Sequence, residues 1–276
     1  MDISKLFKKN EGDFTTFPLT LDTYAWFKPI LILIIAGLIA FALSAVVMAI
    51  LRADPSKDGI IQLIYTAITM IALIPGIYIA TKLLYKIPFS TQIAPVRKWN
   101  WGIYIKVFII SAIIYGAFQS FQILSSGVSI NPPSIAIILL CLILPLFQGF
   151  AEEYLCRGLL MQTFGSWFKI PIVAVVLQAL IFAVLHPYQL FAFAGVFCTG
   201  LFYGLITWYG QGLESSSAMH AVNNIFAFLA IGLGIQQSAA GGSSIISFVM
   251  NLVLLLVPIL IIIVLDKKFN WFALKE

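Results

Sequence analysis

The sequence predicts an all-α integral membrane protein that crosses the bilayer several times. Of its 276 residues, 61% are hydrophobic and 10% are charged, and the mean hydropathy is +1.03. A soluble domain carries about 25% charged residues, so lipid is the simplest solvent for this surface. The formal net charge of +5 comes from basic residues near the ends of apolar runs, a pattern that indicates orientation in a membrane and not nucleic-acid binding.

Apolar stretches of spanning length recur along the chain. A helix needs about 20 mainly apolar residues to cross about 30 Å of hydrocarbon, and about eight stretches meet this requirement. In order they are 29–51, 59–81, 101–124, 134–164, 171–185, 190–208, 213–233 and 245–265. The breaks between them have a chemical cause: the Pro132-Pro133 pair cannot continue a helix, and the Ser-, Ala- and Gly-rich run 238–244 is expected to be a flexible loop.

The distribution of Lys and Arg predicts that both termini are cytoplasmic. Of the 16 basic residues, Arg52 and Lys57 fall on one side of the predicted spans and Arg157 lies within a span, whereas all the others fall on the opposite side. Cytoplasmic loops carry the excess of basic residues. We therefore expect a cytoplasmic segment 1–28, a transmembrane domain 29–265 and a cytoplasmic tail 266–276. The short loops favour a bacterial plasma membrane.

Five ionisable residues lie within the predicted spans and need an explanation. They are Glu152, Glu153, Arg157, His186 and His220, and the two histidines are the only ones in the chain. An ionisable side chain at membrane depth costs at least about 2.5 kcal/mol, so it usually serves a function. A single buried histidine is more often a satisfied core residue. Two histidines beside a pair of buried carboxylates instead favour a functional site.

The two adjacent glutamates are expected to have different roles. Glu153 and Arg157 are four residues apart, so they share a helix face in the order that favours an ion pair. Glu152 points about 100° away and lacks that partner. We therefore expect Glu153 to be structural and Glu152 to carry the chemistry. The alternative is a packing clamp without catalysis.

The same spacing of four residues links the histidines to polar or aromatic partners. Phe182 shares a face with His186, and His220 shares one with Asn224. At 1.5 Å per residue, Glu152, His186 and Asn224 lie about 18, 24 and 17 Å from the inner ends of their helices. Allowing for helix tilt, these side chains can meet in one cavity near mid-membrane.

Taken in order, the motifs Glu152-Glu153-x-x-x-Arg157, Phe182-x-x-x-His186 and His220-x-x-x-Asn224 resemble those of the CPBP family. Its members are CAAX proteases and bacteriocin-processing enzymes, often called Abi proteins. The resemblance covers about 134–233. It implies an eight-span helical fold and peptide-bond hydrolysis inside the membrane.

The resemblance also implies roles for individual residues and a class of substrate. Glu152 with His186 would activate water, and His220 with Asn224 would form the oxyanion hole. The substrate would be a membrane-associated, prenylated or leader peptide. Zinc held by Glu152, His186 and His220 would leave an open position for water, whereas a buried carboxylate could activate water without metal, and both alternatives stay open.

Two other functions are compatible with the sequence. A transporter or channel would use the buried Glu and His side chains as an ion path, although the sequence has no evident internal repeat. An immunity or scaffold protein of the same family would keep the motifs without turnover. The oligomeric state is not indicated by the sequence.

Overall fold

The computed structural model describes residues 3–54, 59–236 and 244–272, so the predicted loop 238–244 lies almost entirely outside the described residues. Every regular element among the described residues is helical. The elements, in order, are η1 (Ile3–Phe7), η2 (Phe17–Thr20), α1 (Lys28–Leu51), α2 (Gly59–Ile71), α3 (Leu73–Tyr85), α4 (Phe89–Ile93), α5 (Trp101–Ser126), α6 (Ile135–Glu153), η3 (Tyr154–Met161), α7 (Gln162–Phe168), α8 (Pro171–Val184), α9 (Leu190–Gly210), α10 (Glu214–Gly232) and α11 (Ile245–Phe269).

The helices confirm the predicted class of an all-α, multi-pass membrane protein. Among the described residues, 6 helices are long and apolar enough to cross a membrane. They are Lys28–Leu51, Gly59–Tyr85, Trp101–Ser125, Ile135–Phe168, Leu190–Gly210 and Ile245–Phe269. The remaining two predicted spans correspond to α8, which has only 14 residues, and to α10, which is less apolar than the spanning helices. The expected total of about eight crossings therefore stays a prediction.

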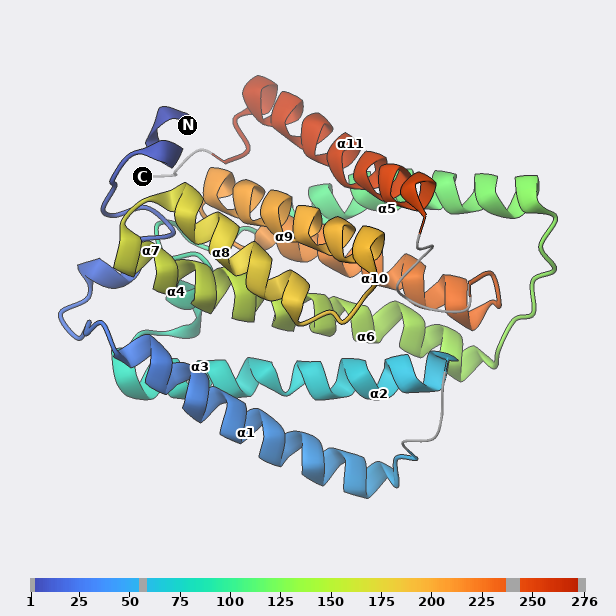
Figure 1. The fold of residues 1–276 in the computed structure, drawn as a ribbon, viewed down its shortest axis with the longest axis horizontal. Helices are drawn as coiled ribbons and strands as arrows, with labels where there is room; N and C mark the ends of the chain where they lie inside the picture. Colours follow the sequence, from blue (N-terminus) through green and yellow to red (C-terminus); the bar gives the residue numbers. More distant parts are fainter. Residues whose placement is uncertain (1–2, 55–58, 237–243, 273–276) are drawn as a thin grey trace.

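The bundle has two ends, which we call inner and outer. The inner end carries the ends of α3, α7 and α9, and the outer end carries the ends of α1, α5 and α10. The first described residues and the end of α11 both lie at the inner end (Figure 1). Which end faces the cytoplasm stays a prediction from the Lys and Arg distribution.

Helix α10 forms the centre of the bundle. It packs most extensively against α6 and α5 and also contacts α9 and α2. The contact with α6 is close because Gly149 faces α10, where an added Cβ would lie 3.0 Å from the backbone nitrogen of Ala221. Small residues allow such close approach of membrane helices. The contact places the end of α6 beside the first two turns of α10.

The fourth predicted span is one continuous helix of changing winding. It begins as α6, becomes the π-helical segment η3 after Glu153, and ends as α7. The sequence predicted a helical span over 134–164 and contained no signal for the change of winding at Tyr154–Met161. A π-helical segment has wider turns and often occurs at functional sites. Arg157 lies within this segment.

The N-terminal segment packs onto the inner end of the bundle. Trp208 Nε1 donates a 2.9 Å hydrogen bond to Asp13 Oδ2, and the Phe14 backbone N–H donates a 2.8 Å hydrogen bond to Gln211 Oε1. Phe14 is completely buried. Residues around Asp13 therefore pack as part of the helical bundle, and the cytoplasmic location of 1–28 stays a prediction.

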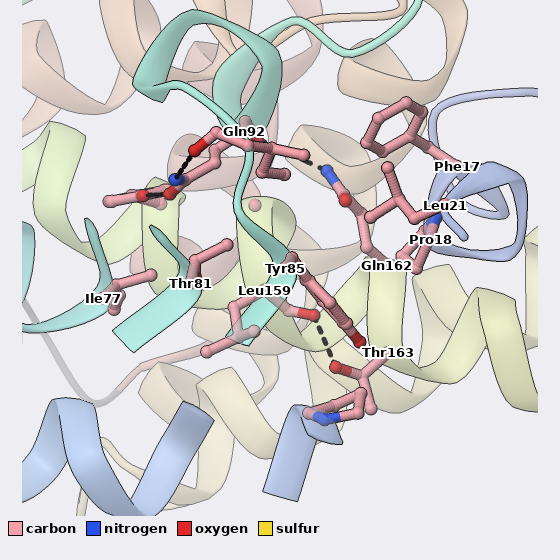
Figure 2. A pocket seen from close by; sticks show the side chains of 14 residues that line it. Phe17, Pro18, Leu21, Ile77, Thr81, Tyr85, Gln92, Leu159, Gln162 and Thr163 are labelled. Carbon is pink, nitrogen blue, oxygen red and sulfur yellow. Dashed lines mark hydrogen bonds between the residues drawn. The ribbon is translucent and has the colours of Figure 1, made fainter. Parts of the chain in front are cut away.

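A second group of inner-end residues surrounds η3 (Figure 2). The Gln92 side-chain oxygen accepts a hydrogen bond from the Tyr154 hydroxyl. The Gln92 backbone carbonyl accepts one from Gln162 Nε2 at 3.4 Å. The cavity among these residues measures about 20 Å³. This volume holds one water molecule at most, so the pocket is too small for a substrate.

Substituting Gly165 by alanine is expected to displace the N-terminal segment. The added Cβ would lie 2.1 Å from the backbone oxygen of Thr15, a distance that no relaxation of a flexible side chain can relieve. We expect the free energy of unfolding to fall by about 1–3 kcal/mol, measured by thermal unfolding in detergent. The control is Gly116→Ala, whose Cβ would meet only the Phe226 ring, at 3.5 Å. Equal stability of the two variants would contradict this packing.

The connection between α8 and α9 stops short of the outer end. Helix α8 is about 21 Å long at 1.5 Å per residue, and Figure 1 shows the α8–α9 connection ending before the outer ends of α5, α6 and α10. The connecting residues 185–189 therefore lie inside the span of the bundle. This connection includes His186.

Candidate active site

Three helical segments bring the predicted site residues together in the middle of the bundle. Glu152 and Glu153 end α6, His186 follows α8, and His220 and Asn224 lie on α10. Four of them, Glu152, His186, His220 and Asn224, line one cavity. The depths estimated from the sequence are consistent with this arrangement.

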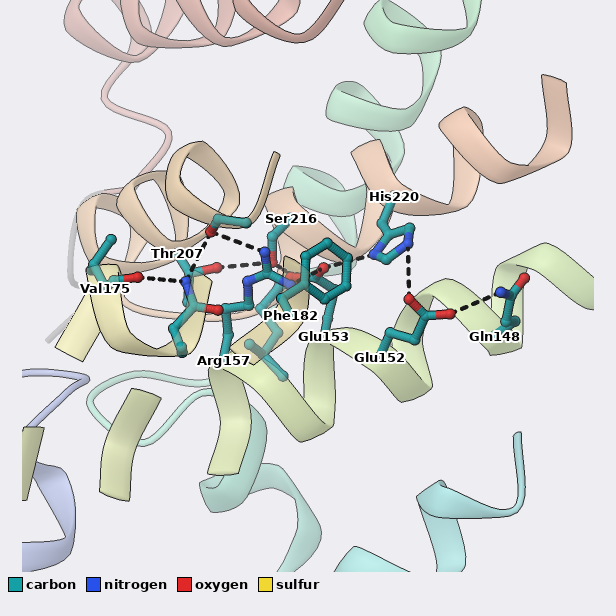
Figure 3. Close-up of polar contacts among 12 residues, drawn as sticks. Gln148, Glu152, Glu153, Arg157, Val175, Phe182, Thr207, Ser216 and His220 are labelled. Carbon is teal, nitrogen blue, oxygen red and sulfur yellow. Dashed lines mark hydrogen bonds and ion pairs between the residues drawn. The ribbon is translucent and has the colours of Figure 1, made fainter. Parts of the chain in front are cut away.

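Glu153 is the centre of a buried polar network (Figure 3). Its Oε1 accepts a 2.8 Å hydrogen bond from Arg157 Nη1 and lies 2.7 Å from His220 Nδ1. Arg157 Nη2 donates to the backbone carbonyl of Gly200 at 3.0 Å. Glu153 and Arg157 are both fully buried. The Glu153–Arg157 ion pair expected from the spacing is present, and the same carboxylate also contacts His220.

Among the described residues, no Lys or Arg side chain pairs with Glu152, whose carboxylate instead faces the two imidazoles. Its Oε1 accepts a 2.8 Å hydrogen bond from Gln148 Nε2. Its Oε2 lies 3.5 Å from His220 Nε2 and 4.0 Å from His186 Nε2. Both separations exceed the length of a direct hydrogen bond. They are distances that one water molecule can bridge.

The other nitrogen of each imidazole is bound to an acceptor. His220 Nδ1 lies against the Glu153 carboxylate, and His186 Nδ1 lies 2.7 Å from the backbone oxygen of Phe182. A carbonyl oxygen can only accept, so His186 Nδ1 carries the proton in this hydrogen bond. In its neutral form, His186 therefore presents an unprotonated Nε2 to the cavity, because the partner of one ring nitrogen fixes the tautomer.

Phe182 supports both histidines with its ring. The ring centroid lies 4.8 Å from that of His186 and 5.9 Å from that of His220, both in edge-to-face geometry. The Arg157 guanidinium lies over the same ring, 4.7 Å from its centroid. Phe182 therefore contacts three of the five ionisable residues, which explains why an aromatic residue at this position suits the site.

Asn224 is oriented by two neighbouring amides. Asn223 Nδ2 donates a 2.9 Å hydrogen bond to Asn224 Oδ1, and Asn224 Nδ2 lies 3.3 Å from Gln148 Oε1. Gln148 in turn donates to Glu152. The amide N–H groups of Asn224 are thus directed toward Gln148, on the side of the cavity that holds Glu152.

The cavity that these residues share has a volume of about 560 Å³. This falls within the range of small-molecule and peptide sites. One wall is polar and consists of the residues described above. A second wall is apolar and includes Leu63, Met70 and Leu73 from α2 and α3. A ligand with both a peptide bond and a hydrophobic group fits such a lining.

Sequence reasoning missed Gln148. This residue bonds both Glu152 and Asn224 and is 8% exposed. It lies four residues before Glu152 in an otherwise apolar stretch. The same spacing rule that selected Phe182 with His186 could have selected Gln148 as a partner of Glu152.

The expected zinc ligands do not form a metal-binding group as placed. Across residues 3–54, 59–236 and 244–272, no group of three or more His, Cys, Asp or Glu side chains could hold a metal ion. The 4.0 Å between Glu152 Oε2 and His186 Nε2 exceeds the edge of about 3.4 Å between tetrahedral zinc ligands. The chemistry proposed below has no step through zinc, and a zinc requirement stays a prediction.

The segment that carries this site matches a known protein family. Residues 133–226 match the family model described as type II CAAX prenyl endopeptidase Rce1-like. This match agrees with the resemblance of the motifs to the CPBP family. The matched segment begins before α6 and ends within α10, so it includes every predicted site residue. It supports an intramembrane CAAX-type protease and gives no support for the Abi or metalloprotease assignments.

One curated relative is similar to a larger part of the chain. The protein named Uncharacterized protein YyaK, from Bacillus subtilis (strain 168), is 28% identical over 188 residues. The match covers 62% of this chain and 61% of that protein, so the chain spans less than two thirds of its relative. No solved structure matches the chain.

Proposed function

We propose that this chain is an intramembrane endopeptidase that hydrolyses a peptide bond with water activated by Glu152 and His186. One observation carries the proposal. The Nε2 atoms of both histidines face a single oxygen of Glu152, at 4.0 and 3.5 Å, inside a cavity large enough for a peptide segment. The match to the Rce1-like family model supports the same class of reaction.

The first step is the activation of water. A water molecule between Glu152 Oε2 and His186 Nε2 donates one hydrogen bond to each, because both atoms are acceptors in the state described above. Its oxygen lone pair is then free to attack the peptide carbonyl carbon. Glu152 takes one water proton as the oxygen–carbon bond forms, and it later gives that proton to the amine when the carbon–nitrogen bond breaks.

The second requirement is stabilisation of the negative oxygen of the tetrahedral intermediate. We assign this role to His220 and Asn224. With both ring nitrogens protonated, His220 donates from Nδ1 to Glu153 and from Nε2 to the substrate oxygen. Asn224 Nδ2 supplies a second donor. Donors that are fixed before the reaction contribute most in a cavity with little water, and Glu153 and Asn223 fix these two.

The substrate class follows from the two walls of the cavity. We propose a membrane-associated peptide with a hydrophobic group, such as a prenylated C-terminus or a leader peptide. The apolar wall accommodates the hydrophobic group while the peptide bond lies beside Glu152. The name of the matching family, a CAAX prenyl endopeptidase, supports the prenylated peptide.

Cleavage of reporter peptides by the purified protein in lipid vesicles tests the proposal. His186→Ala and His220→Ala should each lower the cleavage rate by about 10²–10⁴-fold, because each removes a group that handles a proton or the oxyanion. Both variants should still insert and unfold cooperatively, as judged by circular dichroism. Wild-type rates in either variant would refute the assigned roles.

Proton or solute flux through vesicles without peptide cleavage would instead indicate a transporter, and folded protein with neither activity would indicate a scaffold.

A further inference from the structure

A second cavity adjoins the proposed active site toward the outer end of the bundle. It has a volume of about 180 Å³ and lies among α5, α9, α10 and α11. Among the described residues, its polar lining consists of neutral side chains: Tyr115, Gln119, Gln122, Tyr188, Thr199, Asn223, Gln236 and Asn251. We call this space the amide chamber.

Gln119 provides the first argument that the amide chamber is hydrated. This residue lines the chamber and is 9% exposed, and its amide is not among the described fully buried polar groups that lack a partner, so the amide is accessible from the chamber. A buried amide without a partner costs about 1–3 kcal/mol, and polar groups at membrane depth therefore face protein partners or a water-filled cavity. One water molecule needs about 10–15 Å³, so 180 Å³ accommodates several.

The backbone around the chamber supports the same conclusion. The α8–α9 connection ends within the bundle (Figure 1), and Tyr188 from this connection lines both cavities. Non-helical backbone at membrane depth is tolerated where it is buried in protein or lines a water-filled cavity. A hydrated amide chamber would be such a cavity for the backbone of the α8–α9 connection.

The amide chamber is linked to the catalytic carboxylate by a chain of hydrogen bonds. The two cavities share the side chains of Thr199 and Asn223. The Tyr115 hydroxyl donates to Asn223 Oδ1 at 3.1 Å, and Asn223 Nδ2 donates to Asn224 Oδ1 at 2.9 Å. From Asn224 the contacts continue through Gln148 to Glu152. Asn223 therefore stands between the chamber and the site of hydrolysis.

We propose that the amide chamber is a water reservoir that supplies the reacting water to Glu152 from the outer end, apart from the apolar wall that receives the substrate. Each peptide bond hydrolysed consumes one water molecule, and a hydrophobic substrate that fills the larger cavity would displace water from it. A separate polar space keeps water beside Asn223 during that time. The neutral character of the polar lining favours water over an ion or a peptide carboxylate. The supply role rests on the proposed function, whereas the hydration of the chamber does not.

Hydroxyl-radical footprinting in lipid nanodiscs tests the hydration directly. Radicals generated from water label aromatic rings that contact water. We expect Tyr115 and Phe118, which line the chamber, to be labelled faster than Phe121, which lies on the same helix and is 66% exposed on the outside of the bundle. The comparison uses wild-type protein and needs no enzymatic activity. Labelling of Phe118 as slow as that of Phe121 would overturn the proposal.

Kinetics of Gln119→Leu test the supply role. Losing one hydrogen bond to the stored water should lower kcat by about tenfold and leave KM for the reporter peptide unchanged. The matched control is Gln62→Leu, on the exposed face of α2 and outside both cavities, which should change neither constant. A raised KM with unchanged kcat would show a peptide subsite and refute the reservoir. If the chamber residues are labelled but the protein cleaves no peptide, the proposed function and the supply role are both refuted. The hydration of the chamber would still be established by the labelling.

Discussion

Glu152→Gln is expected to lower peptide cleavage by about 10²–10⁴-fold and to leave the protein folded. The amide of glutamine cannot take a proton from water, so the general base is lost. Glu152 lies 3.5 and 4.0 Å from the two imidazoles and makes one direct hydrogen bond, with Gln148. The folded structure should therefore depend little on the charge of Glu152. The measurements are kcat/KM for a reporter peptide and the midpoint of thermal unfolding.

The neighbouring variant Glu153→Gln provides the matched comparison. It should lower the unfolding temperature, because Arg157 would be left without its carboxylate in a fully buried position. If Glu153→Gln were stable and inactive while Glu152→Gln kept its activity, the roles of the two glutamates would have to be exchanged.

Arg157→Ala is expected to lower the stability of the protein more than Gly165→Ala does. Removing one partner of a buried ion pair costs about 3–5 kcal/mol, because the other charge stays buried and uncompensated. Here the Glu153 carboxylate would keep its contact with His220 but lose its guanidinium partner, and the cation over Phe182 would be lost. The expected result is a large fall in the unfolding temperature of the purified protein.

Two further variants separate stability from catalysis. Lys169→Ala removes an exposed ion pair with Glu11 and should have no measurable effect on the unfolding temperature, because exposed pairs contribute little.

The double variant Glu153→Leu with Arg157→Met replaces the buried pair by apolar side chains and should recover much of the lost stability. It should stay inactive, since His220 loses the acceptor at Nδ1. Recovery of both stability and activity would show that Glu153 has no part in orienting His220.

Hydropathy predicted the helices well because the bilayer requires long apolar runs and internal backbone hydrogen bonding. The boundaries agree with the structure for α1 and α5. The π-helical segment after Glu153 was not predictable, since no propensity rule distinguishes it from an α-helix. The buried pair of Arg97 with Glu214, at 2.6 Å, was also missed, because hydropathy does not show that these two distant positions meet.

The sequence predicted individual pairs of side chains but not the network that joins them. Spacing of four residues identified the Glu153–Arg157 pair from one helix alone. The contact between Glu153 and His220 depends on how α6 and α10 are rotated toward each other. That rotation is set by tertiary packing, including the close approach at Gly149, which a single sequence does not encode in any local pattern.

The short length of α8 has a consequence for the surrounding lipid. Its outward residues Val176, Leu180, Val184 and Leu185 are 38–64% exposed, yet the helix covers about 21 Å where the hydrocarbon layer measures about 30 Å. Lipids relieve such a mismatch by thinning locally. Acyl chains beside α8 should therefore be compressed. A polar peptide that approaches from this side would cross a thinner hydrocarbon layer before it reaches His186.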